Sequence, residues 1–144
     1  MVVEAAAELD RVPTSDRTAL EVVAVRLAVL QEQHDWPALR DLAADFVRRA
    51  PDQAAGWVTW AYATRRAASL ELAEEILRQA EQRHPKEATI QFKLGCYACQ
   101  RGDLAGARRR VDRAIALNSN FTRAATTDPD LAPLRAAAPR RKST

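Results

Sequence analysis

Apolar residues recur every three or four positions along most of the chain, which is the spacing that places them on one face of an α-helix. In the middle of the chain two successive runs keep this spacing: Trp57, Trp60, Ala61 and Thr64, then Leu72, Ile76, Leu77 and Ala80. No segment shows the strict alternation of apolar and polar residues that is typical of a β-strand. The pattern therefore predicts an all-α protein built from consecutive amphipathic helices.

Several of these positions repeat with a period of 34 residues. The repeated positions are helix-capping residues, turn or helix-ending residues and two sets of packing residues: Asp35, Ser69 and Asp103; Pro51, Pro85 and Ser119; Leu39, Ala73 and Ala107; Phe46, Ala80 and Ala114. Asp and Ser start helices because their side-chain oxygen accepts a free backbone N–H, whereas proline ends them because it lacks that N–H. Each unit is therefore predicted to form a helix, a short turn and a second helix that ends at a proline or an equivalent turn residue.

This order resembles the tetratricopeptide repeat family, whose 34-residue unit carries W-x2-L-G-x2-Y, then A-x3-F, then P. The matching residues of the three units, in chain order, are Val23-x2-Arg26-Leu27-x2-Leu30 with Leu39-x3-Ala43, Phe46 and Pro51; Trp57-x2-Trp60-Ala61-x2-Thr64 with Ala73-x3-Leu77, Ala80 and Pro85; and Gln91-x2-Leu94-Gly95-x2-Ala98 with Ala107-x3-Val111 and Ala114. The resemblance implies a right-handed superhelix of three antiparallel helix pairs, an α-solenoid with short capping helices. Small residues, such as Gly95 opposite Ala107, would let the two helices of a pair approach closely.

The predicted organisation has caps at both ends, because a single helix pair cannot bury its own apolar face. Residues 1–18 form an N-terminal cap segment with a leading helix at 2–10, and three repeats fill 19–121, at about 20–53, 54–87 and 88–121. Residues 122–135 form a C-terminal cap and 136–144 a disordered basic tail. Phe121 is expected to pack back on the third repeat, and Asp128-Pro129 to start a further helix.

Composition narrows the function classes. The chain has 144 residues, a net charge of +3, 47% hydrophobic residues, four glycines, two cysteines and two histidines. These values describe a soluble globular chain, and none of the phosphate-loop, metalloprotease or nucleophile-elbow motifs is present. We therefore expect no enzyme activity, no cofactor and no metal. Three acids in the first ten residues and short aliphatic runs argue against a signal peptide or a membrane span, so we expect a cytoplasmic protein.

The resemblance also implies a concave groove lined by the first helix of each repeat. The residues on the groove side of these helices would be Val25 and Ala28; Val58, Thr59, Tyr62, Arg65 and Arg66; and Phe92, Lys93 and Cys96. An apolar strip edged by basic residues suits a peptide with apolar anchors and an acidic group. The predicted function is an adaptor or chaperone-like module that binds a peptide segment of another protein, with self-association through the end repeats. An equally weighted alternative for Arg65 and Arg66 is that they are solvated cations near a helix C-terminus.

Other functions remain open at this stage. A narrower version is a type III secretion chaperone, because some of those resemble this chain in length and in having three repeats. A nucleic-acid contact would use the arginines of 108–113 and the basic tail, although the packing pattern places those arginines on the convex outer side. A redox or metal role would use the pair Cys96-x2-Cys99, although that pair lies in the middle of a predicted helix with no strand before it.

Overall fold

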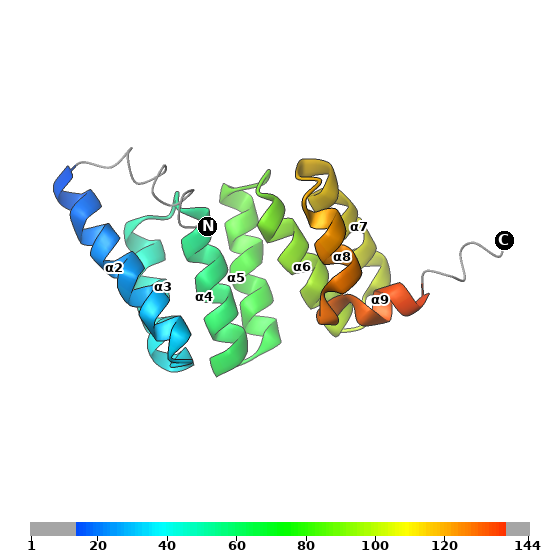
Figure 1. The fold of residues 1–144 in the computed structure, drawn as a ribbon, viewed down its shortest axis with the longest axis horizontal. Helices are drawn as coiled ribbons and strands as arrows, with labels where there is room; N and C mark the ends of the chain where they lie inside the picture. Colours follow the sequence, from blue (N-terminus) through cyan, green and yellow to red (C-terminus); the bar gives the residue numbers. More distant parts are fainter. Residues whose placement is uncertain (1–13, 138–144) are drawn as a thin grey trace. The chain divides into compact units, whose positions relative to one another are not determined.

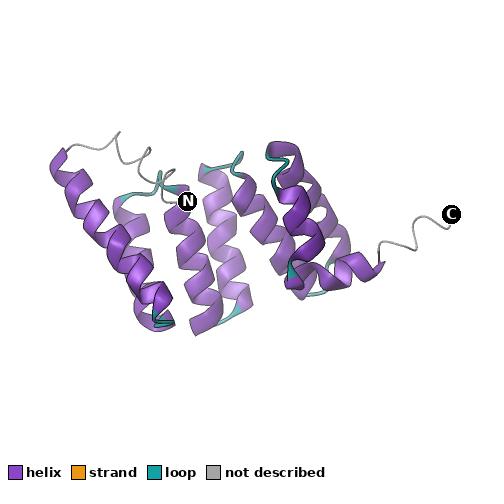
Figure 2. Ribbon diagram, viewed as in Figure 1, coloured by secondary structure: helices purple, strands orange, loops and turns teal. Residues whose placement is uncertain are grey.

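The computed structural model describes residues 14–137, and all regular structure in that range is helical (Figures 1 and 2). The elements in chain order are α2 (Thr14–Glu32), α3 (Trp36–Arg49), α4 (Ala54–Ala67), α5 (Leu70–Arg83), α6 (Ala88–Gln100), α7 (Leu104–Leu117), α8 (Phe121–Thr127), the 3₁₀ helix η1 (Pro129–Leu131) and α9 (Ala132–Ala137). The all-α prediction is confirmed. The leading helix predicted at 2–10 and the tail from residue 138 onward lie outside the described residues.

The chain divides into two compact units, one ending at Arg83 and the other beginning at His84. The first unit contains α2 to α5, in which α2 packs on α3, α3 on α4, and α4 on α5. The second unit contains α6 and α7, with the closing segment α8, η1 and α9 packed against them. The first predicted repeat and residues 54–83 of the second therefore lie in the first unit, and residues 84–87 lie in the second unit with the third repeat.

The three residues predicted to start helices at a spacing of 34 all do so. The Asp35 carboxylate accepts the Ala38 N–H at 3.3 Å, and the Ser69 hydroxyl accepts the Leu72 N–H at 3.2 Å. The Asp103 carboxylate accepts the Gly106 N–H at 2.9 Å. Each bond satisfies one backbone donor of the first helical turn, which has no partner within the helix.

One buried cluster of the first unit is built from one face of α2 together with α3 and α4. Its buried members are Leu20, Val23, Leu27, Leu39, Ala43, Phe46, Ala50 and Ala63. Phe46 lies so close to α4 that a Cβ on Gly56 would come within 2.7 Å of its ring. Trp57, also buried, donates its indole N–H to the carbonyl of Pro51 at 2.8 Å. A glycine at 56 and a bonded indole therefore allow α3 and α4 to pack tightly.

In the second unit, α6 and α7 approach each other at Gly95. A Cβ at this position would lie 2.9 Å from Val111 Cγ2 and 3.3 Å from the carbonyl oxygen of Ala107. Ala107 itself is fully buried. This confirms the predicted close approach of the Gly95–Ala107 pair.

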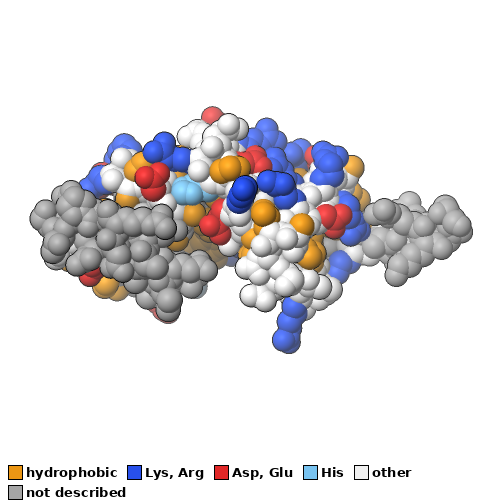
Figure 3. Space-filling view, turned by 90° about the horizontal axis from the view of Figure 1, so that it is seen from above, with side chains coloured by type: hydrophobic (Ala, Val, Ile, Leu, Met, Phe, Trp, Pro, Cys, Tyr) orange, Lys and Arg blue, Asp and Glu red, His pale blue; other side chains and the backbone are white. Residues whose placement is uncertain are grey.

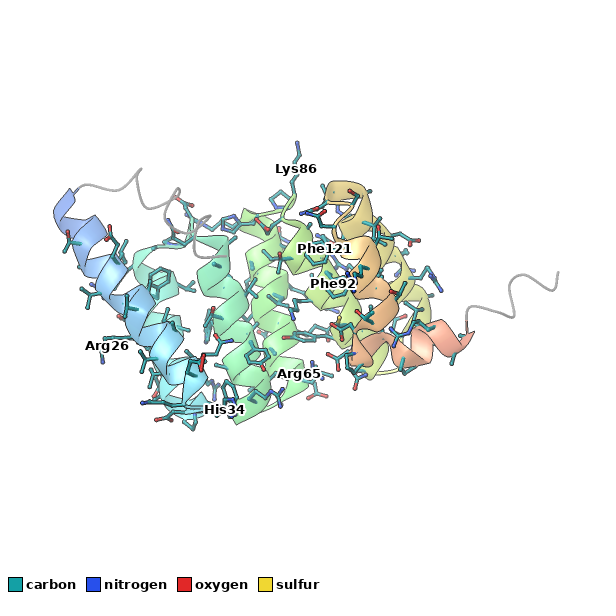
Figure 4. The ribbon with its side chains drawn as sticks, viewed as in Figure 1. Arg26, His34, Arg65, Lys86, Phe92 and Phe121 are labelled. Atoms are coloured by element: carbon teal, nitrogen blue, oxygen red, sulfur yellow. The ribbon has the colours of Figure 1, made fainter. Side chains whose placement is uncertain are left out.

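The closing segment folds back onto α6 and α7. The rings of Phe92 and Phe121, both labelled in Figure 4, face each other across α6 and α8. Their centroids lie 4.9 Å apart, and Leu131 is fully buried. The Asp128 carboxylate accepts the Asp130 N–H at 2.9 Å, with Pro129 at the start of η1. The predicted packing of Phe121 and the predicted Asp128-Pro129 helix start are both confirmed. Helix α9 continues to Ala137, so residues 136 and 137, which the sequence assigned to the tail, are helical.

Candidate functional site

The outward side of α4 is partly open, whereas most of the opposite side is buried and Trp60 there is half-buried. Ala61 and Thr64 are fully buried, as the predicted packing requires. On the other side the predicted groove residues Val58, Thr59, Tyr62 and Arg65 are half-buried and Arg66 is exposed. This helix therefore presents two arginines, one aromatic ring and two smaller side chains from its outward side.

Helix α2 presents an apolar stripe on its outer side. Val25 is 63% exposed, and Ala28, the second residue predicted from this helix, is exposed as well. Val22 and Val29, at 56% and 47%, extend the stripe one turn in each direction. The sequence analysis did not single out Val22 and Val29, although their spacing from Val25 places them on the same side of a helix.

The structure corrects the prediction for two residues of α6. Phe92 and Cys96, predicted to line an open groove, are 3% and 1% exposed. Phe92 is covered by Phe121, and Cys96 has the carboxylates of Asp128 and Asp130 nearby, because the chain after α7 turns back onto α6. Lys93 is half-buried. Within the second unit, Lys93 is thus the accessible member of the three predicted residues.

Four side chains meet where α2 ends, α3 begins and α4 ends; we call His34, Trp36, Tyr62 and Arg66 the aromatic–arginine cluster. His34 stacks on Trp36 with ring centroids 5.1 Å apart, and Trp36 meets Tyr62 edge-on at 5.4 Å. The Arg66 guanidinium carbon lies 5.7 Å from the Trp36 ring centroid and 5.3 Å from that of Tyr62. Arg66 also donates to the Tyr62 hydroxyl at 3.3 Å. Guanidinium groups at such distances are attracted by the negative faces of aromatic rings.

Two members of this cluster, His34 and Trp36, were missed as site residues by the sequence analysis. His34 adopts a positive φ of 56°, which lets the chain turn sharply between α2 and α3. That turn brings the imidazole against Trp36, which the sequence identified only as the apolar residue after a cap. The 34-residue period gave no signal for the cluster, because its members come from three helix ends rather than from equivalent positions.

The residues of the two alternative functions, the cysteine pair of α6 and the arginines of α7, are both in the described part of the chain. Cys96 and Cys99 are free and buried, and Cys96 forms with Asp128 and Asp130 a group whose ligand atoms lie within 4.8 Å of one another. In the basic region of α7, Arg110 donates to Gln91 at 2.9 Å and Arg113 to the Pro85 carbonyl at 3.1 Å. These two arginines therefore serve contacts within the second unit.

Basic side chains on the face seen in Figure 3 are interspersed with acidic and apolar ones. Among the residues that the structure describes, no helix combines the length and the apolar character that crossing a bilayer requires.

Comparison with solved structures identifies the fold. The Yersinia enterocolitica type III secretion chaperone SycD, in complex with a peptide of the translocator YopD, matches with a TM-score of 0.73 and 15% identity, over 86% of this chain and 95% of that one. The TPR2B domain of yeast Sti1, in complex with pHsp70, matches with a TM-score of 0.69 and 16% identity, over 84% and 97%. No family model and no curated protein matches the sequence. The chain thus has the fold of tetratricopeptide repeat proteins, in line with the resemblance of its repeats.

Proposed function

We propose that this protein is an adaptor or chaperone-like module that holds a peptide segment of a partner protein against the outward side of α4. The observation that carries the proposal is the asymmetry of α4. On one side of this helix Ala61 and Thr64 are fully buried and Trp60 is half-buried, whereas the other side keeps Tyr62 half-buried and Arg66 exposed in the folded chain. Aromatic and arginine side chains are the residues that most often dominate binding energy at protein interfaces. The proposed role is binding rather than catalysis.

The two solved neighbours support this role at the level of the fold. The solved structure of SycD is a complex with a peptide of YopD, and that of the Sti1 domain is a complex with pHsp70. Both are thus cases in which a fold of this kind receives a segment of another protein. The identity to either neighbour is 15% or 16%, so the partner of the present chain must be found by experiment.

A narrower candidate is a chaperone of the type III secretion kind. The match to SycD suggests it, with a TM-score of 0.73 against 0.69 for the Sti1 domain, although the two matches cover similar shares of this chain, 86% and 84%. This candidate predicts a secreted client whose stability in the cell depends on the present protein. Deleting the gene should then deplete one secreted protein, whereas a general adaptor would leave the secreted set unchanged.

Self-association is a second part of the proposal. The valine stripe of α2 is exposed, and stripes of this kind at the end of a repeat array can pair with another copy. The proposed setting is the cytoplasm, where buried thiols such as those of Cys96 and Cys99 stay reduced. Light scattering of the wild type and of Val25→Glu would test the pairing. If the stripe is the interface between two copies, the glutamate charge would be buried there, and the variant should have a lower molecular mass in solution than the wild type.

The test of partner binding is affinity capture from the native cell lysate with three forms of the protein. The binding-face variant carries Tyr62→Ala and Arg65→Glu. Its matched control carries Leu117→Ala and Arg109→Glu, which also truncates one apolar side chain and reverses one arginine, but on α7. All three forms should be equally helical by circular dichroism.

The proposal predicts that a protein captured by the wild type and by the control is lost with the binding-face variant. Capture of the same set by all three forms, or by none, would contradict binding at this face.

A further inference from the structure

Four other arginines of the first unit pair with carboxylates, whereas Arg66 is held by aromatic rings. Arg48 and Arg49 pair with the Asp45 carboxylate, and Arg78 and Arg83 pair with Glu74 and Asp52. Arg66 takes part in no ion pair within the part of the chain that the structure describes. Its contacts are two aromatic rings and one hydroxyl.

The aromatic rings fix Arg66 without using up its charge. A guanidinium has five N–H donors in a planar fork, and one of them is directed to the Tyr62 hydroxyl at 3.3 Å. A ring face attracts the cation but does not neutralise it, and it leaves the edge of the fork for another acceptor. Arg66 therefore remains an exposed positive charge whose side chain has lost much of its freedom before any partner arrives.

The frame around Arg66 is itself well anchored. Trp36 opens α3 directly after the Asp35 cap and packs partly against the core of the first unit. His34, labelled in Figure 4, lies in the sharp turn between α2 and α3 and stacks on the same ring. The carboxylate of Asp35, the acid in this turn, accepts the Ala38 N–H and so serves the helix start.

A carboxylate is the group that complements this arrangement. It is planar, carries one negative charge and accepts two parallel N–H bonds from a guanidinium fork. We propose that Arg66, oriented by Trp36 and Tyr62, receives the carboxylate of an Asp or Glu side chain in the peptide of the partner protein. This inference rests on the proposed function, since it specifies which chemical group of the peptide this end of α4 recognises. Trp36 and Tyr62 act as positioning residues and Arg66 makes the contact.

The site is a single arginine set between two rings at the ends of helices. One planar carboxylate matches its guanidinium fork, and the carboxylate of an Asp or Glu side chain within a peptide has this form.

The experiment uses the full chain and two matched probes, the N-acetylated, C-amidated peptides Leu-Glu-Leu and Leu-Gln-Leu. Nuclear magnetic resonance follows the side-chain N–H signals of Arg66 and Trp36 during titration of each peptide. We expect both signals to shift with the glutamate peptide and its affinity to exceed that of the glutamine peptide by about fivefold, because hydrogen bonds between charged groups are roughly twice as strong as neutral ones. Added salt should lower the affinity for the glutamate peptide and leave the affinity for the glutamine peptide unchanged.

Two variants and one control separate recognition from general charge. Arg66→Lys keeps the charge but removes the fork and its ring contacts, so it should lose the preference for glutamate. Arg26→Lys makes the same change at an exposed arginine of α2 and should leave the preference unchanged. Tyr62→Phe keeps the ring but removes the hydroxyl, so the Arg66 N–H signal should show greater mobility and the preference should fall between wild type and Arg66→Lys.

Equal affinity for both peptides, or no shift at Arg66 with either, would overturn the inference. So would an equal loss of preference in the Arg26→Lys control, or binding of inorganic phosphate at Arg66 as tight as that of the glutamate peptide. These outcomes leave the capture experiment unaffected. A partner captured through α4 without any carboxylate preference would keep the proposed function and reject the role of Arg66.

Discussion

Replacing Gly95 with alanine tests the closeness of α6 and α7. On an exposed helix position this substitution stabilises, because glycine is about 0.8–1.0 kcal/mol less favourable than alanine in a helix interior. At Gly95 the added Cβ would lie 2.9 Å from Val111 Cγ2, 3.2 Å from Arg110 Cβ and 3.3 Å from the Ala107 carbonyl oxygen. The sign of the stability change therefore reports whether the two helices approach as closely as the structure shows.

The three contacts determine the magnitude. Carbon atoms pack best at about 3.5–4.0 Å, so the new methyl falls about 0.6–1.1 Å short at Val111. The other two atoms belong to the backbone or are fixed to it, and cannot rotate away. Overpacking of this kind costs about 1–3 kcal/mol, which exceeds the gain in helix propensity. We expect Gly95→Ala to lower the free energy of unfolding by about 1 kcal/mol, and by no more than about 2 kcal/mol.

The assay is urea unfolding followed by circular dichroism, with a calibration pair and a rescue. Arg109→Gly against Arg109→Ala measures the glycine–alanine difference at an exposed position of α7. Val111→Ala removes the nearest atom, so the double variant should be more stable than the sum of the two single changes predicts, by at least about 0.5 kcal/mol. If Gly95→Ala stabilises the protein as much as the calibration pair predicts, the reasoning about this contact is wrong.

Three further substitutions have simpler expected outcomes. Asp103→Ala should lower the free energy of unfolding by about 1 kcal/mol in urea titration while Asp103→Ser keeps most of it, because a serine can still accept the capped N–H. Leu131→Ala should cost about 2–5 kcal/mol and make the Cys96 thiol react faster with a thiol reagent, since the closing segment is held by this fully buried side chain. Thr64→Val should stabilise the protein by about 1 kcal/mol in thermal or urea unfolding, because the buried Thr64 hydroxyl finds no hydrogen-bond partner among residues 14–137 and valine has nearly the same shape.

The helix starts could be predicted because they depend on local chemistry. Asp35, Ser69 and Asp103 each bond to a backbone N–H three residues away, so the sequence alone contains both partners. The approach of Gly95 to α7 was predictable for a related reason, since a small residue at a repeated position has a defined neighbour in the next helix. Such features follow from spacing along a single repeat.

The aromatic–arginine cluster could not be predicted in the same way. It depends on the backbone of His34, whose positive φ is uncommon for a residue other than glycine and is not indicated by the repeat. It also joins side chains from the ends of three helices, whose relative placement follows from packing of the whole first unit. Sequence reasoning identified Tyr62 and Arg66 from the side of α4 on which they lie, but it could not supply the Trp36 ring that holds the arginine.

The burial of α6 could have been predicted by comparing the second and third repeats residue by residue. At positions 34 residues apart, Tyr62 and Arg65 of α4 are replaced by Cys96 and Cys99 of α6, which are small and apolar. Such a change is expected where a helix side is covered, because an unpaired charge there would be costly. Cys99→Arg, which restores the residue of the second repeat, should therefore destabilise the protein by several kcal/mol, roughly 3–5 kcal/mol in urea unfolding. The reverse exchange, Arg65→Cys, should cost less than about 1 kcal/mol, since that side chain is only half-buried. Equal effects of the two exchanges would mean that α6 is as open as α4, and that a partner peptide has both helices available.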